Sequence, residues 1–151
     1  MKNILRSVII FLILTACGYD PIYSFNGTDF GLTEVKMLNQ NSTTRQIGAG
    51  LRAYKENNNK KRLYVIEIFS NEENIVTSKN SRGNETSFRK KITVLIKVYE
   101  NKKILKSKTF VEEFNYANNE NKFELKKYEN NIEKNLINKI IENIILELYK
   151  I

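Results

Sequence analysis

The chain has 151 residues and a mass of 17.7 kDa, the size of one domain rather than two, and its formal net charge is +8. Hydrophobic residues make up 41% and charged residues 28%, which argues against both a disordered chain and an integral membrane protein. Histidine is absent and there is one cysteine, which argues against zinc sites, histidine-dependent catalysis and disulfide frameworks. We therefore expect no catalytic residues, no metal site, no cofactor and no enzymatic activity.

The first sixteen residues have the build of a secretory signal peptide. Lys2 and Arg6 give a positive start, and an uninterrupted apolar run follows from position 8 to position 14. A membrane-spanning helix needs about 20 apolar residues, so this run is too short to cross a bilayer. A positive start with a short apolar core is typical of export signals, and residues 1–16 are predicted to be one.

The only cysteine follows this segment and has the surroundings of a bacterial lipobox. Leu14, Thr15 and Ala16 precede Cys17, as leucine and two small residues do in that box. In proteins that carry the box, the thiol receives a diacylglyceryl group, the chain is cleaved before the cysteine, and the new amine is acylated. An ordinary cleavage site beside an unrelated cysteine is the alternative, but it would leave a reactive thiol in an oxidising compartment. We predict that Cys17 is lipidated and anchors the chain in a membrane.

The mature chain is predicted to open with a tether and a strand. Residues 17–29 contain the single proline and show no periodicity, so we expect an extended tether there, followed by one domain over residues 30–151. Residues 30–38 alternate as in a strand. On that pattern, one face of the strand carries Thr33, Val35 and Met37.

A helix is predicted next. Residues 41–44 all have side chains that form N-caps, and Thr43 and Gln46 have the spacing of a capping box. The asparagine run at 57–59 should end the helix. Its apolar face consists of Ile47, Leu51 and Tyr54.

Two strands should follow the helix. Residues 62–69 are apolar on both faces, which predicts a central or doubly covered strand, and residues 75–77 should continue it. A turn at residues 82–84 is predicted to lead into the third strand of the sheet. In this third strand Ile92, Val94, Ile96 and Val98 alternate with more polar neighbours.

The sequence at 100–103 predicts a tight turn, and hence a hairpin to a fourth strand over residues 104–116. The phase of this strand is ambiguous, and either a bulge or an aromatic row that faces a ligand would explain it. One face carries Leu105, Thr109 and Val111, and the other carries Phe110, Phe114 and Tyr116.

From residue 121 the apolar residues step by three and four, which predicts a long amphipathic helix. A helix lying on a membrane surface is the alternative, but glutamates on the polar face weaken it. We expect the stripe to pack on the sheet through Ile132, Leu136, Ile140 and Ile144. The order β-α-β-β-β-α predicts an α+β two-layer sandwich, with a four-stranded, mostly antiparallel sheet and two helices on one face.

The start of the mature chain resembles that of a known family. Residues 17–23 read Cys-Gly-Tyr-Asp-Pro-Ile-Tyr directly after the lipobox. This is similar to the LPS-assembly lipoprotein family LptE, whose members often begin Cys-Gly-aromatic-x-Pro-Leu-Tyr. Here Tyr19 holds the aromatic place and Ile22 replaces the usual leucine. The predicted element order agrees with the fold of that family over the mature chain.

The resemblance implies a non-enzymatic role in lipopolysaccharide transport. Members of the family are outer-membrane lipoproteins in the lumen of the β-barrel LptD, the lipopolysaccharide translocon. They help the barrel assemble, plug it and bind lipopolysaccharide. The expected location is the periplasmic side of the outer membrane. The alternative is an auxiliary periplasmic lipoprotein of an ABC-type lipid transporter, but Gly18 after the cysteine favours the outer membrane by the sorting habit of enteric bacteria.

The positive charge is concentrated in one segment. Between Lys79 and Lys108 ten basic residues stand against two acidic ones, so this segment carries +8 and the rest of the mature chain carries −2. Such a patch would attract the phosphates of lipopolysaccharide, although lysines also protect sheet edges from aggregation. Nucleic acid is not an expected partner of an exported protein. The lipopolysaccharide-binding candidates are Arg82, Arg89, Lys90 and Lys91.

Overall fold

The computed structural model describes residues 29–55 and 60–151. The predicted signal peptide, Cys17 and the tether up to residue 28 lie outside the described residues, as does the asparagine run at 57–59. The described elements follow the predicted order of strand, helix, three strands and helix. They are β1 (Phe30–Met37), α2 (Ser42–Arg52), β2 (Arg62–Lys79), β3 (Glu85–Glu100), β4 (Lys103–Ala117) and α3 (Lys122–Tyr149).

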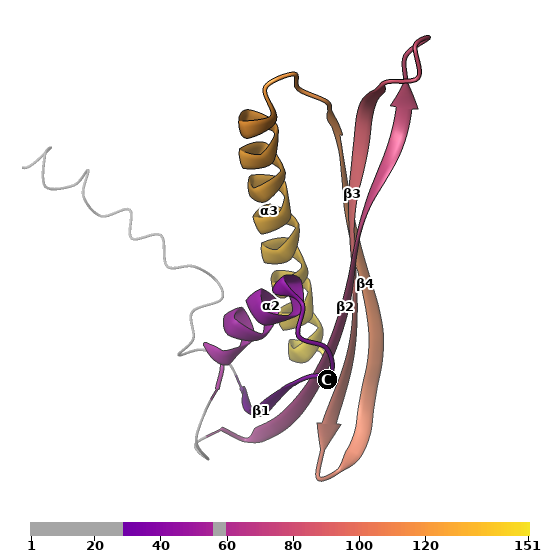
Figure 1. The fold of residues 1–151 in the computed structure, drawn as a ribbon. Helices are drawn as coiled ribbons and strands as arrows, with labels where there is room; N and C mark the ends of the chain where they lie inside the picture. Colours follow the sequence, from indigo (N-terminus) through magenta and orange to yellow (C-terminus); the bar gives the residue numbers. More distant parts are fainter. Residues whose placement is uncertain (1–28, 56–59) are drawn as a thin grey trace, which may run out of the picture.

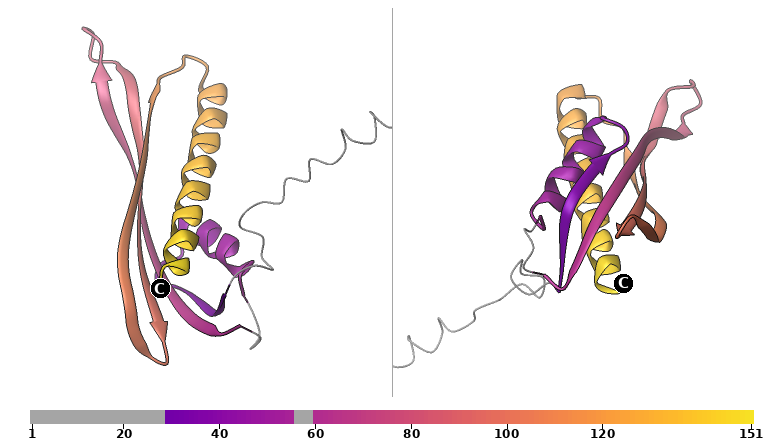
Figure 2. Two further views of the ribbon diagram at one scale, coloured as in Figure 1. Left: turned by 180° about the vertical axis from the view of Figure 1, so that it is seen from behind. Right: turned by 90° about the horizontal axis from the view of Figure 1, so that it is seen from below.

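The four strands form one sheet in the order β1-β2-β3-β4. The crossover through α2 makes β1 parallel to β2, whereas the two hairpins make the other pairs antiparallel. Figures 1 and 2 show both helices on the same side of the sheet. The predicted α+β two-layer fold is therefore confirmed. We call the face under the helices the inner face and the opposite one the outer face.

The core lies between the inner face and the two helices. The predicted alternation of β3 is confirmed, because Ile92, Val94, Ile96 and Val98 are completely buried. The predicted stripe of α3 packs against this face. Its side chains are 0–6% exposed at Ile132, Leu136, Ile140 and Ile144.

The two helices also approach each other closely. A side chain on Gly50 of α2 would place its first carbon 2.6 Å from the Cδ1 atom of Ile141 on α3. A larger residue at this position would force the Ile141 side chain to shift, whereas glycine permits the close approach at the expense of some intrinsic helix stability. Packing against α3, β1 and β2 stabilises α2.

The prediction for the faces of β1 is wrong at Thr33. The pairing with β2 is irregular between Leu32 and Glu34, and this bulge shifts the alternation. Thr33 consequently lies on the outer side, where its hydroxyl donates a hydrogen bond to the carbonyl of Tyr64 at 3.1 Å. Val35 stays on the inner side, beside α2.

The predicted capping box of the first helix is also wrong. The N-cap is Asn41, whose side-chain oxygen accepts a hydrogen bond from the amide of Thr44 at 2.7 Å. Thr43 lies inside the first turn and donates to the carboxylate of Glu72 at 2.7 Å. The tertiary contact with Glu72 uses the hydroxyl that a capping box would have needed.

The long strand β2 is central, as predicted, and it continues without a break to Lys79. It is not doubly covered, because both helices lie on the inner face. On the outer face Phe69 and Ile75 are 43% and 41% exposed. The apolar residues on the outer face of β2 therefore form an exposed apolar surface.

The predicted hairpin between β3 and β4 is confirmed and its geometry explains the ambiguous phase. Asn101 and Lys102 both have positive φ, 48° and 66°, as the two-residue turn of type I′ requires. The pairing shifts between Val98 and Tyr99, so a bulge at the start of β4 changes which side chains face inward. Beyond the bulge, Phe110 is 8% exposed on the inner face.

Candidate functional site

The outer face of the sheet is the surface with the chemistry predicted for binding. No helix in residues 29–55 and 60–151 covers it. It mixes cations with exposed apolar groups. The exposed apolar side chains that it carries are Phe69, Ile75, Ile104, Leu105 and Val111.

Arg89 and Lys91 stand two residues apart on β3, and both point to the outer face. The Nε atom of Arg89 donates to the side-chain oxygen of Asn115 at 2.8 Å, and its guanidinium lies 3.5 Å from the carboxylate of Glu113. Lys91 lies opposite Glu73 on one side and Glu113 on the other. We call Arg89 and Lys91 the basic pair.

Arg82 lies apart from this pair, in the exposed turn between β2 and β3. The side-chain oxygen of Asn80 accepts hydrogen bonds from the amides of Arg82 and Asn84, at 3.0 and 2.9 Å. Gly83 has a φ of 83°, the left-handed conformation that glycine adopts without cost. The turn therefore holds Arg82 at the far end of the hairpin, which Figure 1 shows leaning away from α3.

The structure separates Lys90 from the other three candidates. Successive side chains of a strand point to opposite faces, so Lys90 points to the inner face and its side chain is only 5% exposed. It forms ion pairs with Glu72 of β2 and with Glu133 of α3, the latter at 3.5 Å. Lys90 therefore belongs to the interior and is not available to an external ligand. The grouping of Lys90 with its neighbours in one surface patch is wrong.

The two carboxylates that pair with Lys90 have further hydrogen-bond partners. Burial alone would raise the pKa of Glu72, but the hydrogen bonds from Lys90 and Thr43 outweigh it, and the pKa is lowered. Glu133 also accepts a hydrogen bond from Gln46 of α2 at 3.3 Å. The network of these side chains links both helices to the sheet.

A second ion-pair cluster joins α3 to β4. Glu147 has a side chain that is 6% exposed, and Lys106 and Lys108 reach it from the strand, Lys106 at 3.2 Å. The hydrogen bond from Lys108 is the main reason that the pKa of Glu147 is lowered. Two more residues of the basic segment thus pair with a buried carboxylate, which the charge pattern alone does not indicate.

These contacts predict a pH-dependent loss of stability. A carboxyl group with a lowered pKa stabilises the fold above its ordinary pKa, and this contribution is lost as the pH falls through the lowered value. Glu147→Gln should therefore cost about 1–2 kcal/mol at neutral pH. The difference in unfolding free energy between this variant and the wild-type protein should disappear below about pH 4. Urea unfolding at a series of pH values would measure it. A difference that stays constant over that range would show that the charge of Glu147 is unimportant.

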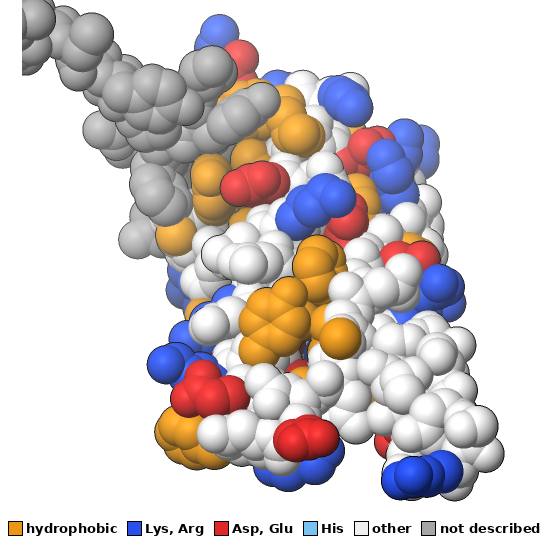
Figure 3. Space-filling view, turned by 90° about the horizontal axis from the view of Figure 1, so that it is seen from above, with side chains coloured by type: hydrophobic (Ala, Val, Ile, Leu, Met, Phe, Trp, Pro, Cys, Tyr) orange, Lys and Arg blue, Asp and Glu red, His pale blue; other side chains and the backbone are white. Residues whose placement is uncertain are grey.

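The end of the molecule near the β2–β3 turn carries a further apolar surface. Figure 3 shows hydrophobic side chains in the middle of this end, surrounded by charged and polar ones. The ring of Tyr116 lies against that of Tyr128, with the centroids 6.3 Å apart, and its hydroxyl donates to the carboxylate of Glu129 at 2.9 Å. Burial and this carboxylate raise the pKa of Tyr116. The exposed apolar side chains of this end are Val76, Phe114, Phe123 and Tyr128.

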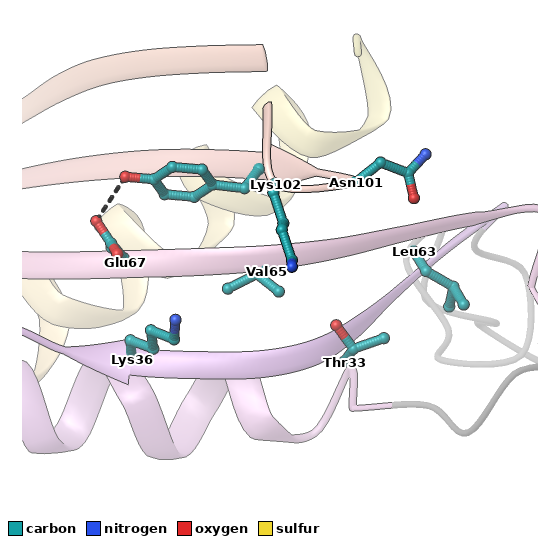
Figure 4. A pocket seen from close by; sticks show the side chains of 8 residues that line it. Thr33, Lys36, Leu63, Val65, Glu67, Asn101 and Lys102 are labelled. Carbon is teal, nitrogen blue, oxygen red and sulfur yellow. Dashed lines mark hydrogen bonds between the residues drawn. The ribbon is translucent and has the colours of Figure 1, made fainter. Parts of the chain in front are cut away.

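Two hollows lie at opposite ends of the sheet. A polar hollow of about 820 Å³ lies between the β2–β3 turn and the start of α3, with Asn84 and Lys122 among its lining residues. A more apolar pocket of about 490 Å³ opens on the outer face beside the β3–β4 turn (Figure 4). Neither hollow is indicated by a sequence motif, because each combines residues that are distant along the chain.

The described residues contain no convergent group of three or more carboxylate or thiol side chains that could hold a metal ion. Among the helices of residues 29–55 and 60–151, none is long and apolar enough to cross a membrane.

Comparison with known proteins shows similarity of structure without similarity of sequence. No protein-family model and no curated protein sequence matches the chain. The chain superposes on lipoprotein B from Nitrosomonas europaea with a TM-score of 0.63 and 12% identity, over 84% of this chain and 90% of that one. For rare lipoprotein B from Shewanella oneidensis the TM-score is 0.58 and the identity 14%, over 78% and 92% of the two chains.

A minor lipoprotein from Acinetobacter baumannii gives a TM-score of 0.56 and 13% identity, over 76% of this chain and 86% of that one. In each case the match spans most of both chains. At such low identity the likeness concerns the fold. The chain therefore has the fold of these bacterial lipoproteins.

Proposed function

We propose that this protein is an outer-membrane lipoprotein that plugs an LptD-like lipopolysaccharide translocon barrel, helps it assemble, and binds lipopolysaccharide on its way to the cell surface. The observation that carries the proposal is the shared fold with bacterial lipoproteins, combined with a lipobox-like sequence that ends at Cys17. The anchor would hold the domain on the periplasmic side of the membrane. The role needs binding surfaces and no catalytic group.

The surface of the domain supports a place inside a barrel. The lumen of a transmembrane barrel is polar, so a plug needs a folded domain with a largely hydrophilic exterior. The outer face offers cations next to the exposed apolar side chains Phe69 and Val111. A phosphate-bearing amphiphile presents the complementary combination of anionic and apolar groups.

Three of the four predicted lipopolysaccharide contacts remain in the proposal. Arg82 is exposed in its turn, and the basic pair points outward from β3. Arginine binds phosphate through two hydrogen bonds, so a lipid phosphate would replace Glu113 as the partner of Arg89. Because these contacts are exposed, salt should weaken them.

Reversal of charge at the basic pair tests the lipopolysaccharide site. Arg89→Glu combined with Lys91→Glu should weaken binding of lipopolysaccharide by the full-length protein at least tenfold, about 1.4 kcal/mol. The measurement is a titration with purified lipopolysaccharide at low and high salt.

A matched control separates this site from a general charge effect. Lys127→Glu combined with Lys134→Glu makes the same change of net charge at exposed positions on α3. This control should bind as the wild-type protein does. Equal binding by the wild type and the Arg89 and Lys91 variant, with both folded, would place the lipopolysaccharide contact elsewhere.

The anchor is tested separately. Cys17→Ala should abolish incorporation of a palmitate analogue, because the thiol is the predicted acceptor, and should leave an uncleaved or soluble product. The measurement is labelling in growing cells followed by separation of membranes. Equal labelling of the variant and the wild-type protein would disprove lipidation at this residue.

A further inference from the structure

The pocket on the outer face has an apolar floor, and its lining comes from β1, β2, β3 and the β3–β4 turn. It has a volume of about 490 Å³, within the range of sites that hold small molecules. Leu63 and Val65 of β2 form its floor, and Thr33 of β1 lies at its edge because of the bulge in that strand. The wall opposite β1 consists of Tyr99 at the end of β3 and the turn that follows it.

Two lysines face this floor from opposite sides. Figure 4 shows Lys36 rising from β1 toward β2, and Lys102 reaching down from the β3–β4 turn to the level of Val65. Lys36 is exposed and lies 3.6 Å from Glu34, an exposed and therefore weak ion pair. Within residues 29–55 and 60–151, Lys102 takes part in no ion pair within 4.0 Å.

The one carboxylate in the lining already has a partner. The hydroxyl of Tyr99 donates a hydrogen bond to Glu67 at 2.8 Å, and this bond raises the pKa of the tyrosine. In the sheet register Glu67 also lies opposite Lys36 of β1 and Lys97 of β3. The lining of the pocket therefore holds two lysines, Lys36 and Lys102, against one carboxylate.

The backbone at Lys102 supports a role for its side chain. The second residue of a type I′ turn is usually glycine, because its φ is positive. Here the φ of 66° is adopted by a lysine, which a glycine would replace without steric conflict. The turn itself gives no reason for a lysine, whereas an anion bound in the pocket would.

We propose that this pocket binds a single-chain anionic amphiphile. Its phosphate or carboxylate would lie between Lys36 and Lys102, and its apolar chain would cover Leu63 and Val65. Lys102 supplies a positive charge that no ion pair among the described residues engages, and Lys36 adds a second whose ion pair with Glu34 is exposed and weak. The apolar floor supplies the affinity that a free anion would lack. The site is separate from the basic pair and does not depend on the proposed function in lipopolysaccharide transport.

Dodecyl phosphate is the probe that tests this site. The full-length protein, kept in the neutral detergent dodecyl maltoside, should bind it in isothermal titration. Lys36→Gln combined with Lys102→Gly should weaken that binding at least tenfold. Lys102→Gly by itself should melt no lower than the wild-type protein, because glycine suits the turn, so the loss would not result from unfolding.

Three controls distinguish the contributions of the overall protein charge, the alkyl chain and the phosphate group to binding. Lys127→Gln combined with Lys134→Gln removes the same charge from α3 and should bind dodecyl phosphate normally. Dodecanol and inorganic phosphate should each bind at least tenfold more weakly than dodecyl phosphate. The proposal is overturned if the wild-type protein does not bind dodecyl phosphate, or if the Lys36 and Lys102 variant binds it as tightly as the wild type. It is also overturned if dodecanol or inorganic phosphate binds the wild-type protein as tightly as dodecyl phosphate does.

Discussion

Ile140→Asp is expected to leave the domain unfolded at room temperature. The side chain of Ile140 is completely buried between α3 and the inner face of the sheet. Loss of a buried isoleucine side chain alone costs about 2–5 kcal/mol, and an unpaired carboxylate in the same place adds a desolvation penalty. The sum is comparable to the total stability of a small domain, about 5–15 kcal/mol. Circular dichroism of the full-length protein in neutral detergent would measure the loss of structure.

A control lies two residues earlier on the same helix. Asn138 is exposed, so Asn138→Asp adds the same carboxylate without burying it and should keep the melting temperature within a few degrees of the wild type. If the Ile140→Asp variant had the same melting temperature as the wild-type protein, α3 would not pack on the sheet through Ile140.

Lys90→Met is expected to cost about 2–4 kcal/mol of unfolding free energy. The substitution keeps the volume of the side chain but leaves Glu72 and Glu133 without their shared cation, and one of these carboxylates is largely buried. Urea unfolding would measure the loss. Replacing Glu72 and Glu133 by glutamine in the same chain should recover more than half of it, because the uncompensated charge is then removed.

The neighbouring lysine provides the control for this result. Lys91 points to the outer face, so Lys91→Met should change the unfolding free energy by less than about 0.5 kcal/mol. Similar losses for Lys90→Met and Lys91→Met would show that the two lysines do not differ in their surroundings.

The elements that can be predicted from the sequence are those that local patterns determine. The alternation around Ile96 and the stripe through Ile140 each reflect one buried face, so both elements and the fold class follow from them. The bulge before Glu34 depends on pairing with β2, and no local residue indicates it. It reverses the predicted face of Thr33.

The candidate site was less predictable because charge along a sequence does not show which face carries it. Three consecutive basic residues on a strand point alternately to two faces, which places Lys90 inside and its neighbours outside. The ion pair between Lys108 and Glu147 joins residues 39 positions apart, a contact that no local pattern contains. For the same reason the pocket between Lys36 and Lys102 becomes visible only in the folded chain.

Capture of the partner from the outer membrane tests the proposed role most directly. The full-length, lipidated protein carrying an affinity tag would be expressed in its own host, and outer membranes would be solubilised in mild detergent before capture. The proposed function predicts that a large outer-membrane β-barrel, the LptD-like translocon, is recovered in stoichiometric amount with the wild-type protein. Recovery of inner-membrane ABC transporter subunits in its place, with no barrel, would contradict the proposal.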